Sequence, residues 1–286
     1  MSQEPSVYLK IFKKNNMNKK IIVENTFAEA FPMKVSSNRE SLLPVAVDGT
    51  LRVLNAGLNA GVEQIIKTSS IVAMFRKPNR TNPYTFGEND WSDENWIEGV
   101  SDYFLSKTKA EKAAWRLMES KGLKNKLTTI NPGGVFGDAL DKKGGTSIEY
   151  IRQFMKGKFP GAPKFAVLIS DVKDIAKAHV ACIGNNKVGG RRLIVGKDVK
   201  RLVELSQLIA EAMPEYKKKL PTKELPNLMV KLISYIDSSA KTMIPDLGIM
   251  MQTDTSYAEE ILGFKFKPAK GCISENAKSV VRLGLV

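Results

Sequence analysis

The first 48 residues of this 286-residue chain contain no glycine, although the whole chain has 21. Cysteine and histidine are scarce as well, with two cysteines, Cys182 and Cys272, and one histidine, His179. The cysteines lie far apart and lack the spacing of metal ligands, so the sequence predicts a reduced, cytoplasmic chain without a bound metal. No apolar run approaches the ~20 residues of a membrane span, so the sequence predicts no membrane partner.

Acidic residues are outnumbered, since Lys plus Arg total 44 and Asp plus Glu total 30, which gives a net charge of +14. Such a surplus can bind nucleic acid or phosphorylated ligands. The lysines are dispersed, however, and no basic cluster alternates with aromatic residues. A solvated basic surface is therefore favoured, and no nucleic-acid partner is expected. The N-terminal lysines have no uninterrupted apolar segment behind them, which argues against a signal peptide.

Residues 101–120 carry the most informative pattern. They are rich in Ala, Lys, Glu and Leu and contain no Gly or Pro, which predicts a helix with Ser101 as its N-terminal cap. On such a helix Tyr103 and Lys107 lie one turn apart. A free tyrosine titrates near ~10, and a cation at ~4 Å would lower this pKa by about three units. Lys107 is therefore expected to tune Tyr103 as an acid or base near neutral pH.

The Tyr–Lys spacing has little weight by itself. With 7 Tyr, and Lys plus Arg making 44 of 286 residues, one such pair is expected by chance, and one occurs. Its context is more informative, because residues 62–68 and 127–130 predict strands on either side of the helix. Strand–helix–strand alternation implies a parallel sheet, with ligands at the carboxyl ends of the strands. Ser70 and the turn at 131–137 follow these two strands, so both are expected at that edge.

The rest of the chain predicts a mixed α/β fold. Strands are expected at 7–12 and 21–23, a helix at 39–60, and a long irregular segment at 71–100. Beyond residue 140 the elements are expected to form a smaller, mostly helical lobe, in which Asp171 caps a helix and His179 packs rather than catalyses. They are helices at 146–156, 171–179, 201–212, 226–240, 254–262 and 273–283, and strands at 165–169 and 192–195. The sequence leaves two alternatives, substrate pocket or core, for Met74, Phe75, Phe86 and the 142–155 region.

Several ordered motifs resemble one family. They are VDGTLRVLNAG (47–57), TSS (68–70), YFLSKTKAEKAAW (103–115), NPGGVFG (131–137), DVKDIAKAHV (171–180) and GGRRLIVG (189–196). With these motifs the chain resembles the extended short-chain dehydrogenase/reductases, and within them the dihydroflavonol-reductase-like branch of the NAD-dependent epimerase/dehydratase superfamily. The resemblance covers about residue 27 to the end. It implies a Rossmann-type parallel sheet with a C-terminal substrate lobe.

The resemblance also implies roles for particular residues. Ser70 and Tyr103 would polarise a substrate carbonyl, Tyr103 would donate the proton, and Lys107 would bind the nicotinamide ribose while tuning Tyr103. The cofactor, NADP or NAD, would be held by Lys107 together with Pro132, Gly133 and Val135. The implied activity is reduction of a small-molecule ketone or aldehyde to an alcohol by hydride transfer.

The glycine-poor start is the main departure from this family. The family begins with a strand, a glycine-rich turn and a helix that bind the adenosine half of the cofactor, and residues 1–48 hold no such turn. The sequence therefore predicts a partial Rossmann-type sheet that lacks the first strands. Losing about three charge-assisted bonds to the pyrophosphate, at ~1.5–3 kcal/mol each, would weaken a micromolar cofactor site to millimolar or worse. The strand at 21–23 would have a bare edge, covered by residues 7–12 or by a second chain in a homodimer.

These expectations divide the chain into three parts and leave alternatives open. The parts are an atypical N-terminal segment at 1–26, a truncated Rossmann-like catalytic core at 27–140, and a substrate-binding lobe at 141–286 with elements that return to the core. The chain is either an NAD(P)-dependent carbonyl reductase or an inactive or truncated relative with impaired cofactor binding. Nucleic-acid binding through the +14 charge is a third, weaker alternative.

Overall fold

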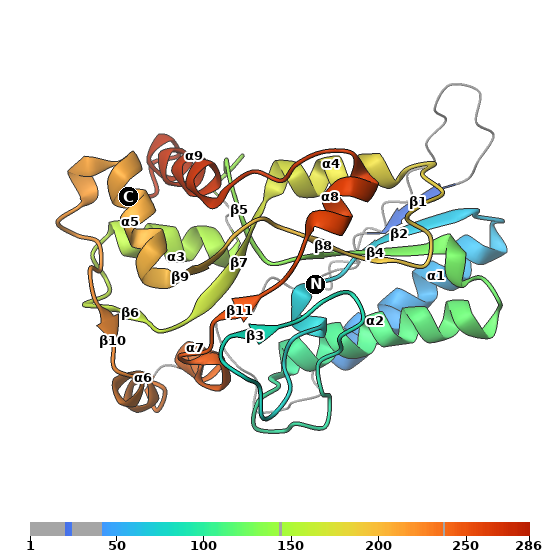
Figure 1. The fold of residues 1–286 in the computed structure, drawn as a ribbon, viewed down its shortest axis with the longest axis horizontal. Helices are drawn as coiled ribbons and strands as arrows, with labels where there is room; N and C mark the ends of the chain where they lie inside the picture. Colours follow the sequence, from blue (N-terminus) through green and yellow to red (C-terminus); the bar gives the residue numbers. More distant parts are fainter. Residues whose placement is uncertain (1–20, 25–41, 143–144, 237) are drawn as a thin grey trace, which may run out of the picture.

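A parallel sheet of four strands forms the centre of the computed structural model, which describes residues 21–24, 42–142, 145–236 and 238–286. Every neighbouring pair in this sheet is parallel, so the carboxyl ends of the strands share one edge. The strand expected at 7–12 lies outside the described residues. The order across the sheet is β1 (Ile21–Glu24), β2 (Gln64–Thr68), β4 (Leu127–Pro132) and β8 (Arg192–Val195) (Figure 1).

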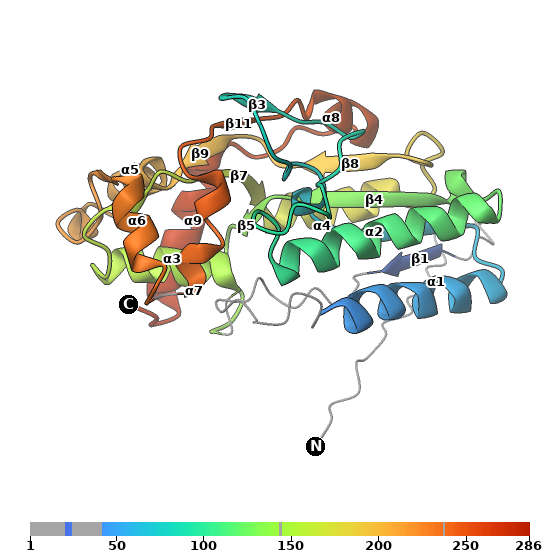
Figure 2. The ribbon, with the colours of Figure 1, turned by 90° about the horizontal axis from the view of Figure 1, so that it is seen from below.

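Helices cover both faces of this sheet. Successive side chains of a strand point to opposite faces, and Ile65 and Ile66 of β2 show the result. Ile65 belongs to a buried cluster with α1 (Gly49–Asn59) and α2 (Asp102–Ser120), whereas Ile66 belongs to one with α4 (Val172–Cys182). Figure 2 shows α1 and α2 on the near side of the sheet and α4 behind it. α8 (Ser256–Leu262) packs on α4 and β8.

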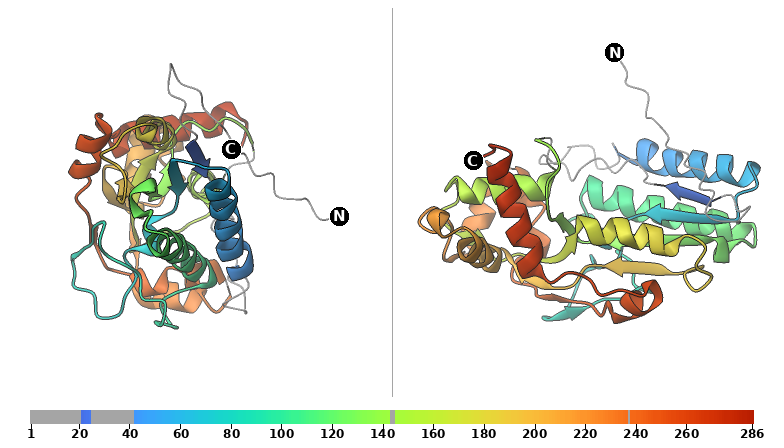
Figure 3. Two further views of the ribbon diagram at one scale, coloured as in Figure 1. Left: turned by 90° about the vertical axis from the view of Figure 1, so that its right-hand side faces the viewer. Right: turned by 90° about the horizontal axis from the view of Figure 1, so that it is seen from above.

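A second sheet begins just beyond the carboxyl end of β4. In it β7 (Ala166–Asp171) runs parallel to β5 (Gly134–Phe136) and antiparallel to β9 (Val199–Arg201). Three helices share a buried apolar cluster with it, and Figure 3 shows them gathered at the end of the molecule away from α1. They are α3 (Thr146–Met155), α5 (Leu202–Ala212) and α9 (Ala269–Arg282).

Two short strand pairs tie distant segments together. β3 (Tyr84–Thr85) pairs with β11 (Met251–Gln252), so the irregular segment at 71–100 is fastened to the C-terminal part of the chain. β6 (Ala162–Pro163) pairs with β10 (Glu224–Leu225), which leads into α6 (Asn227–Ile233) and α7 (Ser238–Lys241).

Two local predictions are wrong. Ser101 makes no side-chain capping bond; instead the carboxylate of Asp102 accepts the backbone N–H of Tyr103 at 2.9 Å. The helix expected at 226–240 divides into α6 and α7, because the chain turns after Ser234, whose hydroxyl donates to the carbonyl of Lys231 at 2.6 Å. The cap at Asp171 is confirmed, since its carboxylate accepts the N–H of Lys173 at 2.8 Å.

The described ranges contain no helix that is long and apolar enough to cross a membrane. Over the same ranges, no group of His, Cys, Asp and Glu side chains is arranged to hold a metal ion. Both cysteines are free and buried, and burial raises the pKa of the Cys182 thiol to about 12. Neither thiol is therefore placed to act as a nucleophile.

Candidate functional site

Ser69 and Ser70 follow β2 directly and face different surroundings. The hydroxyl of Ser69 donates to the buried carboxylate of Glu111 at 2.5 Å, which fixes it in the interior. Ser70 is extended and starts a short 3-10 turn at Ile71–Ala73, in which its Oγ accepts the N–H of Val72 at 3.3 Å. Of this serine pair, only Ser70 lines the large cavity described below.

Tyr103 lies in the first turn of α2, where its phenol meets Ser70. The Tyr103 ring packs edge-on against Phe104, with ring centroids 6.1 Å apart, and its hydroxyl lies near the Ser70 side chain. Burial raises the pKa of Tyr103 to about 12, although hydrogen bonding from Ser70 to the phenolate lowers the pKa in part. The phenol is therefore a neutral hydrogen-bond donor at physiological pH.

Lys107 occupies the expected place one turn along α2. Its Nζ lies 5.6 Å from the centroid of the Tyr103 ring, and the residue is only 8% exposed. The expectation that the pKa of Tyr103 is lowered is wrong, since burial dominates and the pKa is raised. The three predicted catalytic residues are nevertheless brought together at the carboxyl edge of the sheet.

A buried carboxylate holds this part of α2 against the sheet. Glu111 is fully buried and accepts hydrogen bonds from Ser69, from Asn131 Nδ2 at 2.8 Å and from Arg192 Nε at 2.6 Å. Burial alone would raise the pKa of Glu111, but the positive charge of Arg192 and these donors outweigh it, so the pKa is lowered. Glu111 thus fastens the helix of Tyr103 to β2, β4 and β8 at once.

The turn after β4 has glycines because another strand lies against it. A Cβ on Gly133 would stand 2.3 Å from the carbonyl oxygen of Leu168, and one on Gly134 would stand 2.7 Å from Cγ2 of Val167. Both contacts belong to the packing against β7, and the N–H of Gly133 donates to Ser170 Oγ at 2.8 Å. The close approach that requires these glycines is therefore made by β7.

Of the residues predicted to face the cofactor in this turn, two reach the cavity. Gly133 and Val135 line it, and Val135 is 37% exposed. Pro132 is buried within β4, where it pairs with Val195 of β8, and it is not part of the cavity wall.

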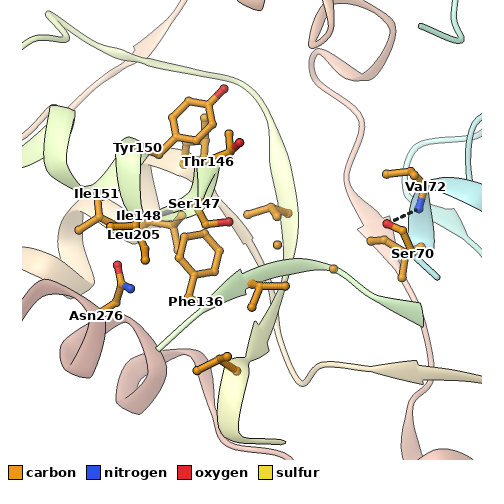
Figure 4. A pocket seen from close by; sticks show the side chains of 18 of the residues that line it. Ser70, Val72, Phe136, Thr146, Ser147, Ile148, Tyr150, Ile151, Leu205 and Asn276 are labelled. Atoms are coloured by element: carbon orange, nitrogen blue, oxygen red, sulfur yellow. Dashed lines mark hydrogen bonds between the residues drawn. The ribbon is translucent and has the colours of Figure 1, made fainter. Parts of the chain in front are cut away.

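The cavity has a volume of about 490 Å³, within the usual range of about 300–1,000 Å³ for small-molecule sites (Figure 4). Ser70 and Tyr103 lie in its wall. Phe75 and most of α3 also line it, whereas Met74 and Phe86 are core residues with 0% and 2% exposure. The other wall segments are the turn at 133–141 and parts of β7, α5 and the 242–251 region.

His179 takes no part in this site. Its Nε2 lies 2.8 Å from Thr68 Oγ1 and its Nδ1 lies 2.8 Å from the carbonyl oxygen of Ile175. Burial lowers the pKa of the imidazole, so it is neutral at physiological pH. It joins α4 to β2, which agrees with the prediction that His179 packs rather than catalyses.

The geometry agrees with the matches to known proteins. The family model described as the 3-beta hydroxysteroid dehydrogenase/isomerase family matches residues 12–184. The chain belongs to this family. It is an extended short-chain dehydrogenase/reductase of the dihydroflavonol-reductase-like kind, as the ordered motifs predict.

Named relatives of this family are reductases. Cinnamoyl-CoA reductase 1 of Petunia hybrida is 29% identical over 262 residues, which cover 91% of this chain and 72% of the relative. The NADPH-dependent methylglyoxal reductase GRE2 of Saccharomyces cerevisiae is 28% identical over 290 residues, covering 95% of this chain and 79% of the relative. The solved yeast methylglyoxal/isovaleraldehyde reductase Gre2 complexed with NADPH has a TM-score of 0.69 at 26% identity, covering 93% of this chain and 77% of that one.

NADPH is the cofactor named for the Gre2 reductases, and the described residues of this chain fit one end of such a dinucleotide. Tyr103, Val135 and the nearby ammonium of Lys107 form a surface suited to the nicotinamide and its ribose. For the pyrophosphate end, the described residues before α1 contain no glycine-rich turn, and residues 1–48 contain no glycine.

Proposed function

We propose that this chain reduces the carbonyl group of a ketone or aldehyde to an alcohol, with NADP or NAD as the hydride donor. The observation that supports this best is that Ser70 and Tyr103 lie near each other in the wall of an apolar cavity, with Lys107 one turn along the same helix as Tyr103. The printed names of the relatives, cinnamoyl-CoA reductase and methylglyoxal reductase, support a carbonyl substrate.

Each of the three side chains has a role in this reaction. A carbonyl oxygen within reach of both hydroxyls accepts hydrogen bonds from Ser70 and Tyr103, which makes the carbonyl carbon more electrophilic. The reduced cofactor, when bound, supplies the hydride. Tyr103 donates its proton to the oxygen as negative charge develops there. Lys107 then stabilises the tyrosinate that remains, because its ammonium lies beside the ring.

Replacing the proton donor tests this proposal. Tyr103→Phe keeps the ring that packs on Phe104 but removes the hydroxyl, so kcat on any reduced aldehyde or ketone should fall by about 10²–10⁴-fold. Steady-state NADPH oxidation with a panel of small carbonyl compounds measures this. Tyr216→Phe, outside the cavity wall, serves as the matched control and should leave kcat unchanged. Equal turnover by Tyr103→Phe and the unaltered chain would rule the proposal out.

A second candidate is a ligand-binding relative without turnover. It is favoured by one observation, the absence of glycine from residues 1–48. Calorimetric titration with NADPH, and separately with NADH, distinguishes the two. A micromolar Kd supports the reductase, whereas no binding up to millimolar cofactor, together with binding of a carbonyl compound to the cavity, supports the second candidate.

A further inference from the structure

The outer face of α6 is apolar, although a helix at the surface normally turns its apolar side chains to the core and polar ones to solvent. Val230 and Ser234, one turn apart, are buried and hold the helix on the molecule. The large side chains on the rest of α6 and on the turn after it are exposed. They are Leu228, Met229, Leu232, Ile233, Tyr235 and Ile236, and they are called the α6 surface below. Figure 1 shows α6 at the margin of the molecule, beside α7.

The α6 surface is a continuous patch. Of the 13 large apolar side chains that stay exposed in the described ranges, six lie within the nine residues from 228 to 236. Apolar residues scattered singly over a surface need no explanation, whereas a contiguous group marks a site that binds a protein or a membrane. Tyr235 is 85% exposed and Ile236 is 94% exposed, so the described part of the chain leaves the end of this patch uncovered.

The charge of the surrounding stretch is positive. Residues 217–241 contain six lysines and two acidic residues, a net charge of +4. Glu224 is paired with Arg201 at 3.1 Å, and Asp237 lies outside the described residues. The lysines are all exposed, and they are Lys217, Lys218, Lys219, Lys223, Lys231 and Lys241. A lysine has a long apolar stem, so its ammonium can stay in a polar layer while neighbouring side chains enter an apolar one.

A second copy of the chain and a membrane are the two occupants to compare. In a two-fold dimer the same surface lies on both sides of the interface, so the lysines of the two copies would face one another. Like charges brought together in this way oppose association. A membrane with anionic lipids instead offers an apolar layer for the exposed side chains and opposite charge for the lysines. Charge complementarity therefore favours the membrane.

We propose that the α6 surface docks the chain on a membrane that contains anionic lipids, with α6 lying in the plane of the interface. Its apolar side chains enter the boundary between headgroups and acyl chains, while the lysines stay among the headgroups. The expectation of no membrane partner was based on the absence of a spanning segment, and docking of this kind needs none. The docking is independent of the proposed reaction, because no residue of the α6 surface belongs to the wall of the cavity.

Co-sedimentation of the full chain with vesicles tests the docking. The chain should bind vesicles of phosphatidylcholine and phosphatidylserine in equal parts, and should bind pure phosphatidylcholine vesicles more weakly. Leu232→Glu should weaken binding to the mixed vesicles by about 10–100-fold, because a leucine that enters the apolar layer is lost. The matched control is Ile97→Glu in the segment at 71–100, which makes the same change of charge at a side chain that is 72% exposed and should leave binding nearly unchanged.

This control separates docking from the general attraction of a chain with a net charge of +14 to anionic lipids. If Leu232→Glu and Ile97→Glu weaken binding equally, general attraction accounts for the binding and the docking is overturned. Absence of binding to either kind of vesicle overturns it as well. Sedimentation velocity without vesicles then examines the other occupant, since a dimer that Leu232→Glu dissociates would assign the α6 surface to a second copy.

A charge variant keeps the test decisive if Leu232→Glu fails to fold. Lys231→Gln should weaken binding to the mixed vesicles about fivefold, because one lysine near the anionic surface is lost. Lys187→Gln removes an exposed lysine between α4 and β8 and should have little effect. Equal binding by these two variants would contradict docking through the α6 surface.

Discussion

The protonation state of Tyr103 is the central question at the scale of single residues. The spacing in the sequence predicts a tyrosine whose pKa is lowered by Lys107, but burial raises the pKa of Tyr103 to about 12. A neutral phenol is the form that a proton donor needs. The lysine therefore acts, in our proposal, on the tyrosinate formed during the reaction and has little influence on the resting phenol.

This pKa is open to direct measurement. A tyrosine whose pKa is raised on folding stabilises the folded chain below its unfolded pKa of ~10, and this stabilisation is lost as the pH rises from ~10 to about 12. The free energy of unfolding of the wild type should therefore fall more steeply over this range than that of Tyr103→Phe. The tyrosinate absorbance of the two proteins should differ by one group that titrates near the upper end.

A second variant separates the effect of Lys107 on turnover from its effect on the pKa of Tyr103. Lys107→Met should leave the tyrosinate titration of the unliganded chain nearly unchanged, because burial is the main cause of the shift. The same variant should lose turnover. A large upward shift of the Tyr103 titration in Lys107→Met would contradict this division of roles.

At the scale of elements, α2 is the helix that positions the site. Phe104, Thr108, Glu111, Trp115 and Met118 follow each other at spacings of four and three, and all are buried. Glu111 therefore stands in the apolar stripe of the helix, and a charge in such a stripe needs a buried partner. A glutamate in the apolar stripe therefore indicates a buried ion pair, here with Arg192. The prediction of the site from Tyr103 and Lys107 did not include this pair.

Breaking this ion pair should loosen α2 from the sheet. Glu111→Gln leaves Arg192 buried without its counter-ion, so the free energy of unfolding should fall by about 3–5 kcal/mol in denaturant titration. The matched control is Glu119→Gln on the same helix, whose pair with Lys124 is about half exposed and should change stability by less than about 1 kcal/mol. Equal effects of the two substitutions would show that Glu111 does not anchor the helix.

The elements that the sequence predicted well are those defined by their own residues. β2, β4 and α2 have continuous apolar or helical patterns between clear boundaries, and their positions are confirmed. The second sheet was not predicted, because β5 has only three residues and gains its strand geometry from pairing with β7. In the same way, the need for glycine at Gly133 comes from Leu168, which lies 35 positions later and cannot be inferred from the turn itself.

At the scale of the whole molecule, the two sheets and the irregular segment at 71–100 meet around the cavity. Arg76 is the main connection. It is 1% exposed, its guanidinium lies 3.5 Å from the centroid of the Phe104 ring, and it donates to Asp246 Oδ2 and to the carbonyl oxygens of Gly99 and Thr242. Arg80 binds the other oxygen of the same carboxylate, at 2.6 Å. Asp246 thus joins the segment before α2 to the chain beyond α7, and both sides form cavity wall.

Asp246→Asn should weaken this connection and the cavity with it. Two buried guanidinium groups lose their counter-ion, so the free energy of unfolding should fall by about 3–5 kcal/mol. Local loosening should appear as faster hydrogen exchange at the amides of Ser92 and Asp93, which bond back to the 73–76 turn. Because Arg76 lines the cavity while Tyr103 and Lys107 are held separately by α2, KM should rise more than kcat falls.

Lys77→Met, which removes the exposed pair with Asp90 in the same segment, is the control and should change neither hydrogen exchange nor KM. If Asp246→Asn loses stability while hydrogen exchange at Ser92 and Asp93 stays unchanged, Asp246 does not hold the 71–100 segment in place.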